Sequence, residues 1–143
     1  MSDLTTIEKI AGLIDWYEKQ PRDYSDVSAL IHWRKKLATL LFSFAGEVGD
    51  LFQEYRAAEF RRKSAFDTKR AEYIAGDMSA AAAEAKAKAD ISSEAKDEMM
   101  AEGIYKKADL LRMHAFAVLD SMNQHIASLK QERRLEMTGT GQQ

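Results

Sequence analysis

Three carboxylates, Glu47, Asp50 and Glu54, stand three and four residues apart in the sequence. In a helix this spacing places them on one face, and oxygen ligands of this kind suit Mg2+. A magnesium site would need a second acidic group on a neighbouring helix, and Glu72 and Asp77 fall at a helix end where they are poor substitutes. The same charges are routine beside an apolar seam, where they stay solvated. We therefore predict no metal site here.

The string AGEVGDLFQE around these carboxylates resembles part of the magnesium motif of all-α nucleotide pyrophosphohydrolases. That resemblance implies a nucleotide-hydrolysing enzyme. The motif of the family has two adjacent glutamates where this chain has Gly46 and Glu47. Because of that departure we predict a protein that is not an enzyme and that uses no cofactor.

A basic stretch follows, interleaved with the rings of Tyr55, Phe60, Phe66 and Tyr73. Cations that neutralise phosphates and rings that stack on bases suit single-stranded nucleic acid. The candidate nucleic-acid-binding residues are Arg56, Arg61, Arg62, Lys63, Lys69 and Arg70. The alternative is that this stretch pairs with acidic residues later in the chain.

Histidine and cysteine give no further site. His32, His114 and His125 lack the spacing of a metal motif, and the chain has no cysteine for zinc, disulfide or thiolate chemistry. Trp16 and Trp33 stand near the start of two expected helices. We expect their rings to be buried where those helices meet.

The elements that position these residues follow from an apolar repeat with alternating spacings of four and three, which is typical of a helix packed along another helix. This packing seam consists of Leu37, Leu41, Phe44, Val48, Leu51, Tyr55 and Ala58. It predicts an all-α fold, a long antiparallel helical hairpin of the coiled-coil type with a short N-terminal helix. A second periodic run, from Tyr105 to Leu129, supplies the opposite arm.

We expect a single domain over residues 1–143, with a short helix in 1–20, a first arm in 26–75, a second arm in 78–137 and a flexible tail in 138–143. Thr5 and Glu8 form a capping box, and Leu4 and Ile7 begin the buried face of the first helix. Gly76, with Asp77 or Ser79 as the next N-cap, marks the turn. A reversal there places Arg70 opposite Glu84, Arg56 opposite Glu98 and Phe60 opposite Glu94.

Composition indicates a cytoplasmic protein, in the bacterial host cytoplasm if the chain is phage-encoded. The chain has 21 basic and 23 acidic residues, so bulk charge does not favour nucleic acid. No stretch reaches the roughly 18 apolar residues of a membrane span, and we expect no membrane partner.

The apolar stripes exceed what one chain covers, and this predicts a homo-oligomer. Gly46 and Gly49 each cost about 1 kcal/mol relative to alanine inside a helix. They mark either a kink or the close approach of another backbone.

The order of parts resembles the small all-helical phage recombination accessory proteins, including the UvsY-like recombination mediators of large tailed phages. The matching strings are FDTKRAEYIAGDMSA and YKKADLLRMHAFAVLDSMNQHIASLKQER, within residues 37–135. The resemblance implies a ring that binds single-stranded DNA and loads a recombinase partner. It also implies DNA contacts from Arg61, Arg62, Lys63, Lys69 and Arg70.

Two functions remain open. The first is an oligomeric phage accessory protein for DNA recombination or replication that binds single-stranded DNA and a partner protein. The second is a protein-only interaction module, such as an inhibitor or sponge of a host defence component. Exposure of Arg61 to Arg70 along a groove or ring favours the first, and their pairing with Glu84 to Glu98 favours the second.

Overall fold

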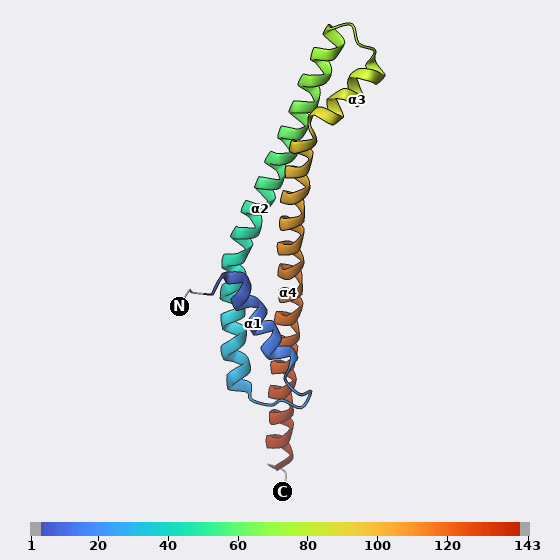
Figure 1. Cartoon of the computed structure of the whole chain (residues 1–143). Coiled ribbons are helices and arrows are strands. Elements are labelled where there is room, and N and C mark those ends of the chain that lie inside the picture. Colours follow the sequence, from blue (N-terminus) through green and yellow to red (C-terminus); the bar gives the residue numbers. More distant parts are fainter. Residues whose placement is uncertain (1–3, 141–143) are drawn as a thin grey trace. The chain divides into compact units, whose positions relative to one another are not determined.

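The computed structural model describes residues 4–140, and the regular elements in that range are all helices. Figure 1 shows the chain reversing between α2 and α3, so the predicted all-α helical hairpin is confirmed. The four helices are α1 (Thr6–Glu18), α2 (Val27–Ala75), α3 (Ala80–Asp90) and α4 (Ser92–Thr140).

The first helix begins with the predicted capping box. The Glu8 backbone N–H donates to the Thr5 hydroxyl at 3.2 Å, and the Glu8 carboxylate accepts from the Thr5 N–H at 2.8 Å. The predicted buried face of this helix is wrong at its first turn. Leu4 and Ile7 are exposed, and the buried residues of α1 are Ile10 and Ile14.

The turn after α2 has the hydrogen bonds of a Schellman motif. The Met78 N–H donates to the Tyr73 carbonyl and the Asp77 N–H to the Ile74 carbonyl, both at 3.1 Å. The left-handed position is Asp77, with φ 66°, and not the neighbouring glycine. Ser79 then caps α3, since its hydroxyl accepts from the Ala82 N–H at 3.3 Å.

The predicted second arm is two helices, because the chain leaves helical geometry at Ile91. Ala83, Ala87 and Ile91 are four residues apart and buried, so the break falls at the last residue of this inward stripe. It shifts the expected pairing: Glu98 meets Arg62 instead of Arg56. At the other end α4 continues to Thr140, so residues 138–140 of the expected tail are helical. The rest of that tail lies outside the described residues.

The described chain forms two compact units. The first contains the residues up to Gly46 and those from Leu110 onward, and the second is Glu47–Asp109. The core of the first unit is built from large side chains, including Leu37, Leu41, Phe44 and Met122. The buried core of the second is small, and it consists of Val48, Ala58, Ala83, Ala87, Ile91 and Ala108. The remaining seam residues Leu51 and Tyr55 are half-buried.

The turn gives a direct test of backbone strain. We expect Asp77→Gly to raise the free energy of unfolding by about 0.5–1 kcal/mol, because glycine adopts positive φ without a Cβ penalty. Asp77→Ala is the matched control and should lower stability. Urea denaturation followed by circular dichroism measures both, and a stabilising alanine would contradict the assignment.

Candidate functional site

The three carboxylates of the possible magnesium motif lie on the exposed side of α2. Glu47, Asp50 and Glu54 are all exposed, while Val48 between them is buried in the seam. Within residues 4–140 no group of three or more acidic, histidine or cysteine side chains is placed to hold a metal ion.

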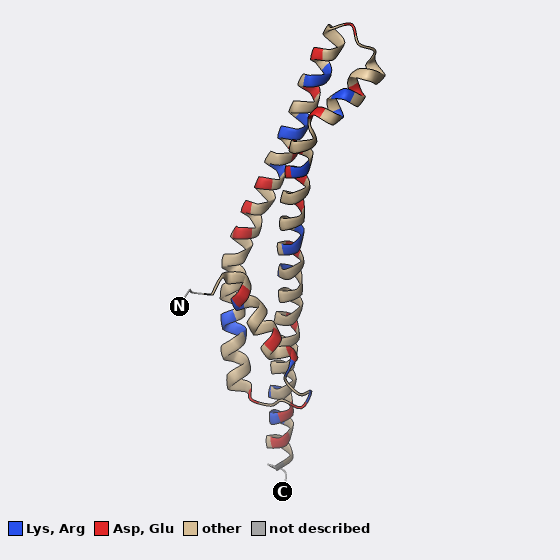
Figure 2. Ribbon diagram, viewed as in Figure 1, with Lys and Arg blue, Asp and Glu red and all other residues tan. Residues whose placement is uncertain are grey.

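The basic stretch does not form one face of α2. Residues seven apart in a helix share a face, so Arg56, Lys63 and Arg70 lie along one side. Arg62 and Lys69 lie along another, which faces α4 at Glu98. Figure 2 shows acidic positions interspersed with the basic ones along this half of α2.

Most of these cations have carboxylate partners nearby. Glu59 accepts from Arg56 at 3.2 Å and from Lys63 at 2.7 Å, and Lys69 lies 3.7 Å from Glu72. The Arg62 guanidinium pairs with Glu98 of α4, and both side chains are largely shielded from solvent. Pairing is thus mainly within α2, with one contact to the opposite arm.

Three of the cross-arm placements expected from the sequence are wrong. Glu84 pairs with Lys88 on its own helix at 3.3 Å, so it is not the partner of Arg70. Arg56 pairs with Glu59, and Glu98 with Arg62. The break at Ile91 shifts the register of α4 against α2. Phe60, which is exposed, therefore does not lie opposite Glu94 as expected.

The cations around Glu59 stabilise the negative charge of its carboxylate. The hydrogen bond from Lys63 lowers the pKa of Glu59, and the charges of Lys63, Arg56 and Arg62 lower it further against the opposing effect of burial. A lowered folded-state pKa means that this carboxylate stabilises the fold above its unfolded pKa. That contribution is lost as the pH falls through the folded-state pKa.

Two cations of the basic stretch differ from the others because they have no carboxylate partner in the described range. Arg61 and Arg70 are exposed, and neither makes an ion pair with any residue in the described range. The surrounding unit carries 11 basic and 14 acidic residues between Glu47 and Asp109, a net charge of −3. The local field is therefore not that of a large cationic patch.

Two of the four aromatic rings of the stretch, Tyr55 and Tyr73, make contacts within the chain. Tyr55 stacks on Tyr105, with ring centroids 6.1 Å apart and an interplanar angle of 4°. Tyr73 donates a hydrogen bond to Asp90, which raises the pKa of Tyr73, and Lys86 lies 4.5 Å from its ring centroid. Phe60 is the ring that remains largely exposed, at 71%.

Two histidines of α4, His114 and His125, make contacts within the first unit. His125 Nε2 donates to the Tyr24 carbonyl at 2.7 Å, and its Nδ1 lies 3.5 Å from the Tyr17 hydroxyl. His114 lies 2.9 Å from Glu18, so α4 contacts α1 at two points. These contacts give both histidines a role in positioning α1.

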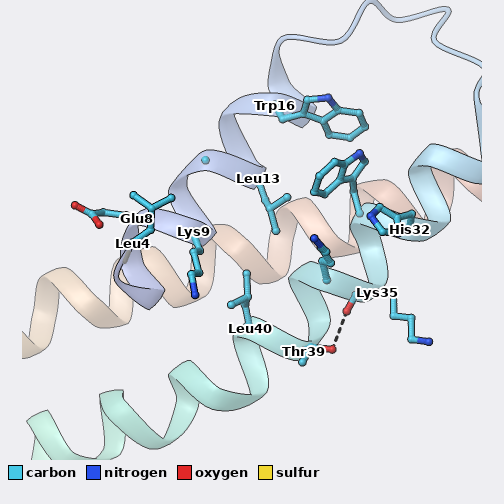
Figure 3. Close-up of a pocket in the computed structure, with 12 residues that line it drawn as sticks. Leu4, Glu8, Lys9, Leu13, Trp16, His32, Lys35, Thr39 and Leu40 are labelled. Carbon is cyan, nitrogen blue, oxygen red and sulfur yellow. Dashed lines mark hydrogen bonds between the residues drawn. The ribbon is translucent and has the colours of Figure 1, made fainter. Parts of the chain in front are cut away.

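A groove between α1 and α2 was missed by the sequence analysis. It measures about 830 Å3 within the first unit, and Figure 3 shows Leu13 of α1 facing Leu40 of α2 across it. Trp16 and Trp33 meet as expected, with ring centroids 5.6 Å apart and planes inclined by 43°. Both rings are half-buried, so the joint is open on one side. The signal in the sequence was a pair of large apolar residues three positions apart on α1, Leu13 and Trp16.

The chain matches no protein-family model, no curated protein and no solved structure. No helix in residues 4–140 is long and apolar enough to cross a membrane. Its function is therefore inferred from the arrangement of its own residues.

The pair between α2 and α4 gives a test of the charge-pairing interpretation. We expect a double-mutant cycle on Arg62→Met and Glu98→Gln to show a coupling of about 1 kcal/mol, because both side chains are partly shielded from water. Arg61→Met is the control, since Arg61 has no ion-pair partner in the described chain, and it should change stability by less than about 0.5 kcal/mol. Urea denaturation measures each variant. A coupling of zero would show that the pair adds nothing.

Proposed function

We propose that this protein acts by binding protein surfaces, as a self-associating helical interaction module, and not by catalysis. The observation that carries the proposal is the amount of large apolar surface left exposed on the long helices. Phe42 is 88% exposed, Met99 69% and Leu110 66%. Large exposed apolar side chains mark sites of protein association where they gather into one patch. An inhibitor or sponge of a host defence component would be one module of this class.

The two glycines of α2 also support self-association. The helix is unbroken from Val27 to Ala75, so Gly46 and Gly49 mark no interruption of it. A Cβ atom at either position would meet nothing within 4 Å, so no close approach inside the chain explains them. Each glycine costs about 1 kcal/mol in a helix. The backbone of a second copy could approach closely there and offset that cost.

Self-association is tested by mass. We expect light scattering to give a mass of at least two 16.2 kDa chains, and the double variant Phe42→Gln with Leu110→Gln to fall toward one chain. Both side chains are exposed, so helicity by circular dichroism should not change. A mass of one chain for the wild type over a wide concentration range would refute self-association.

A second candidate is an accessory role in phage DNA recombination or replication through binding of single-stranded DNA. It is favoured by Arg61 and Arg70, which are exposed without ion-pair partners in the described chain, and by the exposed ring of Phe60. It agrees with the resemblance to UvsY-like mediators, which also load a recombinase. The remaining cations of the stretch support it less, since each has a carboxylate within 4 Å.

The DNA-binding candidate predicts a salt dependence. Binding to single strands should weaken with a log-log slope of about −0.7 for each phosphate contact. We expect Arg61→Ala with Arg70→Ala to reduce the slope by roughly 1.4 if each contacts one phosphate. Arg62→Ala should change it less, because Glu98 already holds that guanidinium. Fluorescence anisotropy with labelled oligo(dT) measures the slope, and no binding by the wild type at low salt would end this candidate.

A further inference from the structure

The groove between α1 and α2 has an apolar floor. Leu13, Trp16, Trp33 and Leu40 are half-buried, so each presents part of its side chain to the open space. Figure 3 shows Leu13 and Leu40 directed toward one another from the two helices. The volume of about 830 Å3 lies in the range of pockets that hold small molecules.

Cations stand at the edge of this floor. Figure 3 shows Lys9 extending from α1 toward the side of Leu40, and the Lys36 ammonium lies 5.2 Å from the ring centroid of Trp33. Neither lysine pairs with a carboxylate in residues 4–140. Glu8 is the acidic residue that lines the groove, and its carboxylate accepts the Thr5 N–H in the capping box. The groove is thus apolar within and positive at its edge.

We propose that this groove binds a small amphipathic anion. The apolar body lies against the two tryptophans, and its carboxylate, phosphate or sulfonate group lies beside Lys9 and Lys36. Lysines without carboxylate partners in the described chain can neutralise such a group, and aromatic walls favour a flat or extended apolar body. This function is separate from the proposed self-association and does not depend on it.

The groove has the size of a small-molecule site, since such sites measure about 300–1,000 Å3 and this groove measures about 830 Å3. Gly12 opens the α1 wall further, since a Cβ there would meet nothing within 4 Å. A ligand of drug-like size fits this space.

Two probes with nearly the same apolar body separate the contribution of the anionic group to binding from that of the apolar floor of the groove. 8-Anilinonaphthalene-1-sulfonate carries the anion, and N-phenyl-1-naphthylamine lacks it. Both tryptophans of the chain line the groove, so their fluorescence reports occupancy. We expect the sulfonate to bind the full-length protein about tenfold more tightly than the neutral probe. Equal affinities, or no change in tryptophan emission, would overturn the proposal.

A filled groove is the first variant to test. Gly12→Leu places a side chain in the open space and improves helix propensity, so the fold should persist while binding of both probes is lost. Gly103→Leu is the matched control. It lies in a helix outside the groove, where a Cβ also meets nothing within 4 Å, and it should bind as the wild type does. Equal probe binding by the two variants would place the site elsewhere on the surface and refute the proposal.

Removal of the cations is the second variant. Lys9→Gln with Lys36→Gln should weaken sulfonate binding about tenfold and leave the neutral probe unchanged. Lys107→Gln with Lys130→Gln removes the same charge from positions outside the groove and should affect neither probe. An equal loss of sulfonate affinity in both pairs would overturn the role of Lys9 and Lys36. If tryptophan emission changed with protein concentration alone, a second copy would be the occupant, and the proposal would be wrong.

Discussion

Burial of one apolar stripe on α2 is the constraint on which the rest of the structure depends. Leu37, Leu41, Phe44 and Val48 are buried at spacings of three and four, and the residues between them remain near solvent. A single stripe on a helix of 49 residues covers only a fraction of its circumference. Phe42 illustrates the consequence, because it is only two positions from Phe44 and yet almost fully exposed. The fold therefore leaves much of the surface of α2 exposed.

The same constraint acts differently in the two units. Large side chains fill the core of the first, whereas alanines make up most of the buried core in the second. Alanine buries little area, and apolar burial contributes only about 25 cal/mol per Å2. Polar and aromatic contacts supplement that core, among them Arg62 with Glu98, Tyr73 with Asp90 and Tyr55 with Tyr105. Residues that look like a nucleic-acid surface in the sequence thus also support the local fold.

Periodicity and capping could be predicted from the sequence, because each depends on residues within a few positions of one another. The seam around Phe44 and the capping box of Thr5 and Glu8 are of this kind. The break at Ile91 could not be predicted, since the alanine-rich stretch before it has uniformly high helix propensity and carries no local signal for a break. Register depends on that break. The sequence therefore could not predict that Glu98 is the carboxylate partner of Arg62. It also could not predict that Asp77 takes the left-handed position.

The groove on α1 is a consequence of how the two tryptophans share one joint. The rings of Trp16 and Trp33 meet at an inclined angle and remain half-buried between α1 and α2. Leu13 and Leu40 line the open space beside these rings. Gly12 adds to that space by having no side chain. Sequence patterns indicate that bulky rings occupy a helix joint, but the space beside them depends on how each ring is tilted. That orientation is set by packing against Tyr24 and Lys36, which a helical repeat does not encode.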